Sequence, residues 1–220
     1  ICIRDSHGPA GETRAARCGY ARILAGGPSL SGSAPRVATA APRLADVHGQ
    51  VDRIEVRRIA PGDERRLREI RIEALEDAPL AFITTAEEAR AHPDDLWHRR
   101  VLAGSSGTDQ ATFLACAGEA TVGMAIGLDR SDRAPGVVAV VSVFVSSSAR
   151  RRGVGDALMS GVESWAMAIG ATTTSLWVVD DNASARAFYE NRGYRPTLDR
   201  QRITAPPQRW ETRMYRTLTD

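Results

Sequence analysis

Apolar residues recur with regular periods after the first fifty residues, and these periods predict the elements of a folded domain. Residues 54–59 alternate between apolar and polar side chains, as in a strand. A helix opens at Asp63, carries an apolar stripe and stops before Pro79. A second helical stretch covers residues 85–102, and Pro93-Asp94 marks an interruption inside it.

Three strands are predicted next. Residues 112–117 and 121–128 read as a hairpin with Gly118-Glu119 at its turn. The run 137–145 has nine residues and only one polar member, Ser142, which is typical of a central strand buried on both faces. This run is too short to cross a membrane, and no other apolar run is longer, so we expect no membrane partner.

The period then changes to that of a helix. Residues 154–169 place their apolar side chains on one face, 173–179 form another strand, and 183–192 form a short helix that Gly193 ends. The last predicted elements are a closing pair of strands, 194–198 and 209–218. The order β-α-α-β-β-β-α-β-α-β-β predicts a mixed α/β domain with a single sheet.

Residues 1–50 differ in kind from the rest. They hold 7 Gly and 4 Pro, show no sustained period, and lack the apolar core of a secretion signal. They match an organelle transit peptide only weakly. We expect a disordered tail or a non-native N-terminal extension, followed by one domain at 51–220.

Composition narrows the chemistry. All 29 basic residues among the 220 are arginine, which excludes mechanisms that need a lysine, such as a phosphate-binding loop lysine or a pyridoxal Schiff base. The net charge is +2, and residues 1–50 carry +3 of it, so the domain carries −1. A domain without a basic excess argues against a nucleic-acid partner.

The chain has too few cysteines and histidines for a disulfide framework or a metal site. Three scattered cysteines favour a reducing compartment, and we expect a cytoplasmic protein. Only His92 and His98 lie in the predicted domain, so no metal site is expected. Cys116 is predicted to be a buried bystander, since no acid or histidine stands beside it in the sequence.

The candidate chemistry lies between the long strand and the helix that follows it. Arg150-Arg151-Arg152-Gly153-Val154-Gly155 combines glycines with the first turn of a helix, whose amides have no internal partner. Together with the helix dipole, these amides favour a phosphate or pyrophosphate. Taken alone the run could equally be a solvated turn. It is not a dinucleotide fingerprint, because Leu158 stands where a third glycine is needed.

A second segment, residues 182–194, strengthens this interpretation. Together the two segments resemble the GNAT superfamily of acyl-CoA-dependent N-acetyltransferases. The first fits the pattern Gln/Arg-x-x-Gly-x-Gly/Ala at Arg150, Gly153 and Gly155. The second fits Asn-x-x-Ala-x-x-Phe-Tyr-x-x-x-Gly-Phe/Tyr at Asn182, Ala185, Phe188, Tyr189, Gly193 and Tyr194. The predicted element order also agrees with that fold from about residue 51 to 218.

The resemblance implies a fold and a donor site. The fold would be a single mixed, mostly antiparallel sheet flanked by helices, with a splayed central strand pair that forms the CoA cleft. The splayed strand would offer backbone groups of Val143, Phe144 and Val145 to the pantetheine arm and polarise the acetyl carbonyl. The pyrophosphate would lie on the loop residues Arg150, Arg151, Arg152, Gly153, Val154 and Gly155.

It also implies roles for two polar residues of the second segment. Asn182 would contact the CoA arm, and Tyr189 would protonate the departing thiolate. Purely structural alternatives stay open for both residues: Asn182 as a helix cap and Tyr189 as a core aromatic packed one turn from Ala185.

The sequence departs from the family pattern in two places. No carboxylate stands on the long strand where many members carry a glutamate, so the general base is unassigned. Glu73, Glu76 and Glu119 are candidates only in so far as they face the cleft. In addition, Ser147 and Arg151 stand where a proline and a glycine are frequent.

The acceptor side is the least defined part. Phe82 and Trp97 are the best candidates to wall an acceptor cleft, and the four tryptophans (Trp97, Trp165, Trp177, Trp210) are expected to be mostly core. The leading hypothesis is transfer of acetyl from acetyl-CoA to a primary amine of a small molecule or a protein, without a metal. The alternative is a non-catalytic acyl-CoA-binding module. A homodimer is possible under either.

Overall fold

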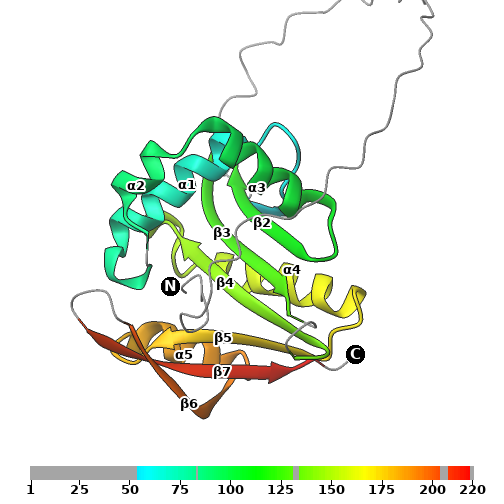
Figure 1. Ribbon diagram of the computed structural model, residues 1–220, viewed down its shortest axis with the longest axis vertical. Helices are drawn as coiled ribbons and strands as arrows, with labels where there is room; N and C mark the ends of the chain where they lie inside the picture. Colours follow the sequence, from blue (N-terminus) through cyan, green and yellow to red (C-terminus); the bar gives the residue numbers. More distant parts are fainter. Residues whose placement is uncertain (1–53, 83, 131–133, 204–207, 219–220) are drawn as a thin grey trace, which may run out of the picture. The chain divides into compact units, whose positions relative to one another are not determined.

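The computed structural model describes residues 54–82, 84–130, 134–203 and 208–218. The expectations for residues 1–50 therefore lie outside the described residues. The described part forms one sheet with helices packed on it, as Figure 1 shows. No helix found there is both long enough and apolar enough to span a bilayer.

The sheet has seven strands in the order β1-β2-β3-β4-β5-β7-β6. Every neighbouring pair is antiparallel except β4 and β5, which are parallel. This confirms the mixed, mostly antiparallel sheet. The strands are β1 (Ile54–Arg58), β2 (Gln110–Ala117), β3 (Ala120–Asp129), β4 (Val137–Val145), β5 (Thr173–Val179), β6 (Arg195–Ile203) and β7 (Arg209–Thr217).

Helices cover both faces of the sheet. The α-helices are α1 (Glu64–Asp77), α2 (Ala86–Ala91), α3 (Asp94–Ser106), α4 (Val154–Ala168) and α5 (Ala183–Asn191), with 3-10 turns η1 (Pro79–Ala81) and η2 (Ser147–Ala149). Side chains of α1, α2 and α3 form one apolar cluster with β2, β3 and β4, which includes Phe144. Side chains of α4 and α5 form a second cluster, which includes Val143. The long apolar strand is thus buried from both sides, as its sequence predicted.

β4 and β5 are paired only at their beginnings. Their ladder consists of Val137↔Thr173, Val138↔Thr174 and Ala139↔Ser175, although β4 continues to Val145 and β5 to Val179. Beyond Ala139 the two strands diverge, which is the splayed central pair that the resemblance implied. Figure 1 shows the two strands separating, with β3 on one side of the split and β7 on the other.

Two expectations differ from the structure at the C-terminal edge. β6 extends to Ile203, beyond the predicted end at 198, because an edge strand can pair on one side while its polar side chains stay in water. Trp210 is 48% exposed, so the expectation that it is core is wrong. The guanidinium of Arg200 covers its ring at 5.1 Å. Cys116 is 8% exposed, as predicted for a buried bystander.

Candidate functional site

The loop between β4 and α4 has an unusual backbone. Arg151 has a φ of 60° and Gly153 a φ of 77°, both in the left-handed region. Such a conformation suits glycine but costs a residue with a Cβ about 1–2 kcal/mol. Arg151, which stands where the resembled pattern often has glycine, therefore carries a side chain on a backbone conformation that glycine adopts more readily.

This loop borders a pocket of about 330 Å³. The open first turn of α4 faces the pocket at Gly153, Val154 and Gly155, and the strand before it contributes Val145. A Cβ built on Gly153 would meet no atom within 4 Å, so the glycine faces open space. The remaining lining residues are Ala149, Arg150, Arg151, Asp156, Ser184 and Phe188.

The three arginines of the triplet differ in what they contact. Arg150 donates from Nε to the carbonyl of Val145 at 3.0 Å and pairs with Asp77 at the last turn of α1. It therefore ties the loop to β4 and α1. Arg151 and Arg152 are exposed, and neither has an ion-pair partner within the described ranges. Their charge is available to a ligand.

α5 reaches the same pocket through its first two turns. Ser184 and Phe188 line the pocket, so the N-termini of α4 and α5 both open onto it. Asn182 caps α5: its Oδ1 accepts hydrogen bonds from the amide of Ala185 and from the hydroxyl of Ser184, both at 3.1 Å. The capping alternative for Asn182 is thus realised, next to the pocket and half-buried.

Tyr189 lies on the opposite side of α5 from solvent. It is fully buried and packs edge-to-face against Phe188 and Tyr194, with ring centroids 5.0 Å and 5.7 Å away. Its side chain does not line the 330 Å³ pocket, whereas that of Phe188 does. The structure therefore places Tyr189 one residue from the pocket wall, and its role as an acid stays a prediction.

A buried ionic network behind α5 was not anticipated from the sequence. The Oε2 atom of Glu163 on α4 accepts from Arg192 at 2.7 Å and from Arg216 at 2.9 Å, and its Oε1 accepts from the Tyr194 hydroxyl at 3.3 Å. Burial raises the pKa of Tyr194 well above its ordinary value, and Glu163 raises it further. Tyr194, which also bonds Thr174 at 2.8 Å, is thereby held neutral.

The networked arginine also neutralises an acid in the pocket wall. Arg192 donates to Asp156 at 2.8 Å. Burial alone would lower the pKa of Arg192, but its contacts with Asp156 and Glu163 raise it, so the guanidinium stays charged. The carboxylate beside the first turn of α4 is thus paired and need not repel an anionic ligand.

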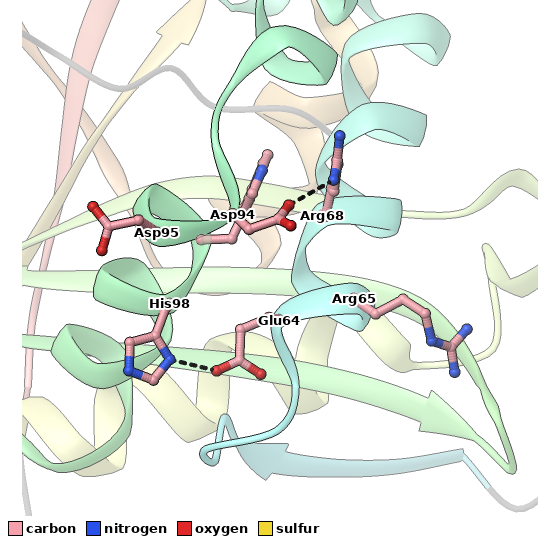
Figure 2. A pocket seen from close by; sticks show the side chains of 7 residues that line it. Glu64, Arg65, Arg68, Asp94, Asp95 and His98 are labelled. Atoms are coloured by element: carbon pink, nitrogen blue, oxygen red, sulfur yellow. Dashed lines mark hydrogen bonds and ion pairs between the residues drawn. The ribbon is translucent and has the colours of Figure 1, made fainter.

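A second pocket, of about 510 Å³, lies between the N-terminal turns of α1 and α3 (Figure 2). Two pairs of its lining residues join the helices across it: Arg68 with Asp94 at 3.1 Å, and His98 with Glu64 at 2.9 Å. The hydrogen bond from His98 lowers the pKa of Glu64. Trp97 lines this pocket and is 1% exposed.

The two acceptor-side candidates are thus separated from the loop. Trp97 contributes to the pocket between α1 and α3, and Phe82 is buried beneath the guanidinium of Arg71, 4.6 Å from its ring centroid. Neither lines the 330 Å³ pocket at the α4 loop. Their assignment to an acceptor cleft stays a prediction.

The candidate bases do not meet the 330 Å³ pocket either. Glu119 pairs with Arg66 and is 94% exposed at the β2–β3 turn, and Glu76 pairs with Arg90. Glu73 is half-buried on α1 and also lies outside that pocket's lining. Across the described ranges no three His, Cys, Asp or Glu side chains gather closely enough to hold a metal ion.

Fold and site together place a pocket beside the loop that follows β4, where β4 has separated from β5. Residues 67–194 match the Acetyltransferase (GNAT) family. Because this match covers more than half of the 220 residues, the chain belongs to that family. It is therefore an acyltransferase, of a family whose general reaction is acyl transfer from CoA. No curated protein sequence matches the chain.

Solved structures agree on the fold. The acetyltransferase of the GNAT family from Streptococcus pneumoniae gives a TM-score of 0.62 at 17% identity, over 76% of this chain and 100% of its own. The PaiA N-acetyltransferase of Thermoplasma acidophilum, in complex with coenzyme A, gives 0.61 at 15% identity, over 76% and 99%. The phosphinothricin acetyltransferase of Sinorhizobium meliloti, in complex with AcCoA, gives 0.59 at 21% identity, over 75% and 88%.

Proposed function

We propose that this acyltransferase moves the acetyl group of acetyl-CoA to a primary amine. The observation that carries the proposal is the pocket at the end of the β4–β5 split, onto which the loop and the N-termini of α4 and α5 all open. A split sheet edge beside an anion site suits a long ligand that has a phosphate at one end and a thioester at the other.

The loop would hold the pyrophosphate. The free amides at the start of α4, from Gly153 to Gly155, and the dipole of that helix favour a doubly charged group. Arg151 and Arg152 would add charge without first breaking an ion pair. Arg150 would act indirectly, because its contacts with Val145 and Asp77 fix the loop.

The freed edge of β4 would hold the pantetheine arm and the thioester. Beyond Ala139 the β4–β5 ladder has ended, so the backbone groups of residues 143–145 that face this edge would be available to a ligand, apart from the Val145 carbonyl, which accepts from Arg150. An amide of this edge would donate to the thioester oxygen and stabilise the negative charge that develops there. The amine nitrogen then attacks the carbonyl carbon, the new C–N bond forms and the C–S bond breaks. The amine loses its proton to water or an unassigned base.

Tyr189 would donate the proton that the leaving sulfur takes. Replacing Tyr189 with Phe removes only the oxygen and keeps the buried ring, so cofactor affinity and melting temperature should stay close to those of the wild type. General acid catalysis is worth about 10²–10⁴-fold, so kcat should fall at least about tenfold where chemistry limits the rate. A wild-type kcat would assign Tyr189 to the core alone.

The acceptor is either a small-molecule amine or an amine of a protein. The similar structures include phosphinothricin acetyltransferase and, with 19% identity, a ribosomal-protein-S18-alanine N-acetyltransferase, so this fold serves both kinds of acceptor.

Release of free thiol from acetyl-CoA, measured against a panel of small amines and peptide N-termini, tests the proposal. Amine-dependent release identifies the acceptor class. Tight binding of acetyl-CoA with no release for any amine would contradict transfer and favour the alternative of an acyl-CoA-binding module.

A further inference from the structure

β4 contains a bulge in the part of the strand that has left β5. Its register against β3 runs from Val141↔Ile126 to Phe144↔Met124, so Ser142 and Val143 stand against Ala125 alone. The last pair with β5 is at Ala139, three positions before the bulge. The bulge therefore lies on the strand edge where the proposed function needs backbone donors.

The bulge reverses which side chains face α4. Val138 and Val140 before it, and Val143 and Val145 after it, all pack in the cluster under α4 and α5. An uninterrupted strand would send 143 and 145 to the opposite face from 138 and 140. The bulge thus sets the direction of the peptide groups that follow Ser142.

Ser142 adopts a conformation that its residue type disfavours. Its φ is 54°, and it shares the left-handed region with Arg151 alone among the described non-glycine residues. Such a backbone persists only where surrounding contacts hold it. The contact on the helical side comes from Arg71 of α1, whose Nη1 donates to the Ser142 hydroxyl at 2.9 Å.

Arg71 is itself fixed in place. It is 7% exposed, and its guanidinium stacks over the ring of Phe82 at 4.6 Å, so the planar group is held by a hydrogen bond at one end and a ring on its face. Phe82 directly follows η1, in the segment that links α1 to α2. The buried side chain of Arg71 therefore connects the helical layer to the strained residue.

We infer that Arg71 is a positioning residue: it holds the β4 bulge so that the amides after Ser142 point at the acetyl carbonyl. This inference rests on the proposed function and adds to it a residue that neither family motif contains. Arg71 acts through the strand and does not touch the reacting atoms. Its loss should impair the chemical step while leaving the pyrophosphate loop able to bind CoA.

Arg71→Met is the first test, because it removes the donor while keeping a long apolar side chain. We expect kcat to fall about tenfold or more, since a small misplacement of a catalytic group can cost up to about 10²-fold. The dissociation constant of acetyl-CoA should change less than about threefold. Arg99→Met is the control: it makes the same change on α3, at an exposed pair with Asp95, and should keep kcat because Arg99 lines neither pocket.

A glycine at the bulge separates positioning from direct contact. Glycine adopts a φ of 54° without strain, so Ser142→Gly should make the bulge independent of Arg71. The double variant R71M/S142G should therefore be several-fold faster than R71M. Ser142→Ala, which keeps the strain and loses the hydroxyl, should resemble R71M. A double variant as slow as R71M would overturn the inference.

A spectroscopic readout makes the test independent of the amine. The carbonyl ¹³C resonance of bound [1-¹³C]acetyl-CoA should shift from its free value in the wild type, move back in R71M and recover in R71M/S142G. If thiol release fails for every amine, this shift still decides the role of Arg71. Wild-type release with an R71M variant unchanged in both kcat and carbonyl shift would refute the role of Arg71 and leave the proposed function standing.

Discussion

The first turn of α4 and the middle of the same helix differ in how their charges are paired. At its N-terminus the chain from Ser142 to Gly153 holds two left-handed residues with side chains, and Arg151 and Arg152 face solvent with no acid partner within the described ranges. Further along, Glu163 is 6% exposed and binds Arg192 and Arg216. The loop before α4 thus combines a strained backbone with arginines that have no ion-pair partner among the described residues. Glu163, in contrast, is paired with arginines of the same domain.

This difference distinguishes the part of α4 that faces the pocket from the part that fixes the helix in the domain. A strained backbone reduces stability and persists where surrounding contacts hold it, often at a site that binds a ligand. Buried charges with complete partners fix the position of a helix. One helix therefore offers its first turn to a ligand while its middle is anchored by the Glu163 network.

The largest effect on the free energy of unfolding is expected at Glu163, in the middle of α4. Glu163→Ala would leave Arg192 and Arg216 without their shared carboxylate, and breaking a buried pair costs about 3–5 kcal/mol. Since Arg216 is partly exposed, we expect about 3 kcal/mol in the free energy of unfolding, measured by denaturant titration. Glu163→Gln should cost less. A loss below about 1 kcal/mol would show that the network is dispensable.

A substitution at the first turn of α4 should weaken the binding of acetyl-CoA, and not only change the stability of the fold. Acetyl-CoA at about 100 times its dissociation constant should stabilise the wild type by about 2.7 kcal/mol, and Gly153→Leu should remove this gain by filling the anion site. Gly170→Leu is the matched control, because Gly170 has a φ of 84° and also faces open space, but follows the C-terminal end of α4. Equal loss of the ligand effect in both variants would move the site elsewhere.

A second paired acid should give a pH signature far from the loop. Asp63 accepts two hydrogen bonds from Arg57 at 2.7 Å, and these lower its pKa below the ordinary 3.8. A lowered pKa in the folded state stabilises the fold above that ordinary value, and the gain is lost as pH falls through the folded-state pKa.

Asp63→Asn should therefore lower the melting temperature most at neutral pH, by the equivalent of about 1.5 kcal/mol. The gap to the wild type should narrow below about pH 4, where the unfolded carboxyl is protonated. Acetyl-CoA affinity should be unchanged. A gap that widens in acid would give Asp63 the opposite role.

The smallest effect concerns strain in the loop. Arg151→Gly should relieve the left-handed backbone and raise stability by at most about 1 kcal/mol, because glycine also gains freedom in the unfolded chain. The same change removes an open cation, so acetyl-CoA should bind a few-fold more weakly at low salt and nearly as well at high salt. A lower free energy of unfolding together with tighter binding of acetyl-CoA would contradict both parts of this expectation.

Sequence patterns predicted most of the fold because its elements are well bounded. The strand at 137–145 and its two-sided burial follow from an apolar run between Gly136 and Ser146. The bulge inside it could not be predicted, since a run that is apolar on both faces does not record a one-residue slip. The end of β6 was missed because Arg200 and Arg202 look like loop residues but lie on an edge strand.

The site was predictable only where a contiguous motif carries it. The loop 150–155 and the cap at Asn182 are local, and the structure places both around one pocket or beside it. Arg71 interrupts the apolar stripe of its helix and would be expected in water. Its buried hydrogen-bond partner is Ser142, 71 residues away. The local pattern of apolar and polar residues cannot indicate a contact at that separation.

The arginine-only composition gains a further meaning from the ion pairs. Every ion pair among the described residues uses Arg or His as its cation. A guanidinium is protonated at neutral pH and is a poor nucleophile toward a thioester, whereas a lysine amine can be acylated. Spontaneous or self-inflicted acetylation by the enzyme's own donor therefore has no side-chain amine to attack within these 220 residues. The arginines that anchor α4 through Glu163 would therefore be chemically inert toward acetyl-CoA bound, as proposed, at the first turn of the same helix.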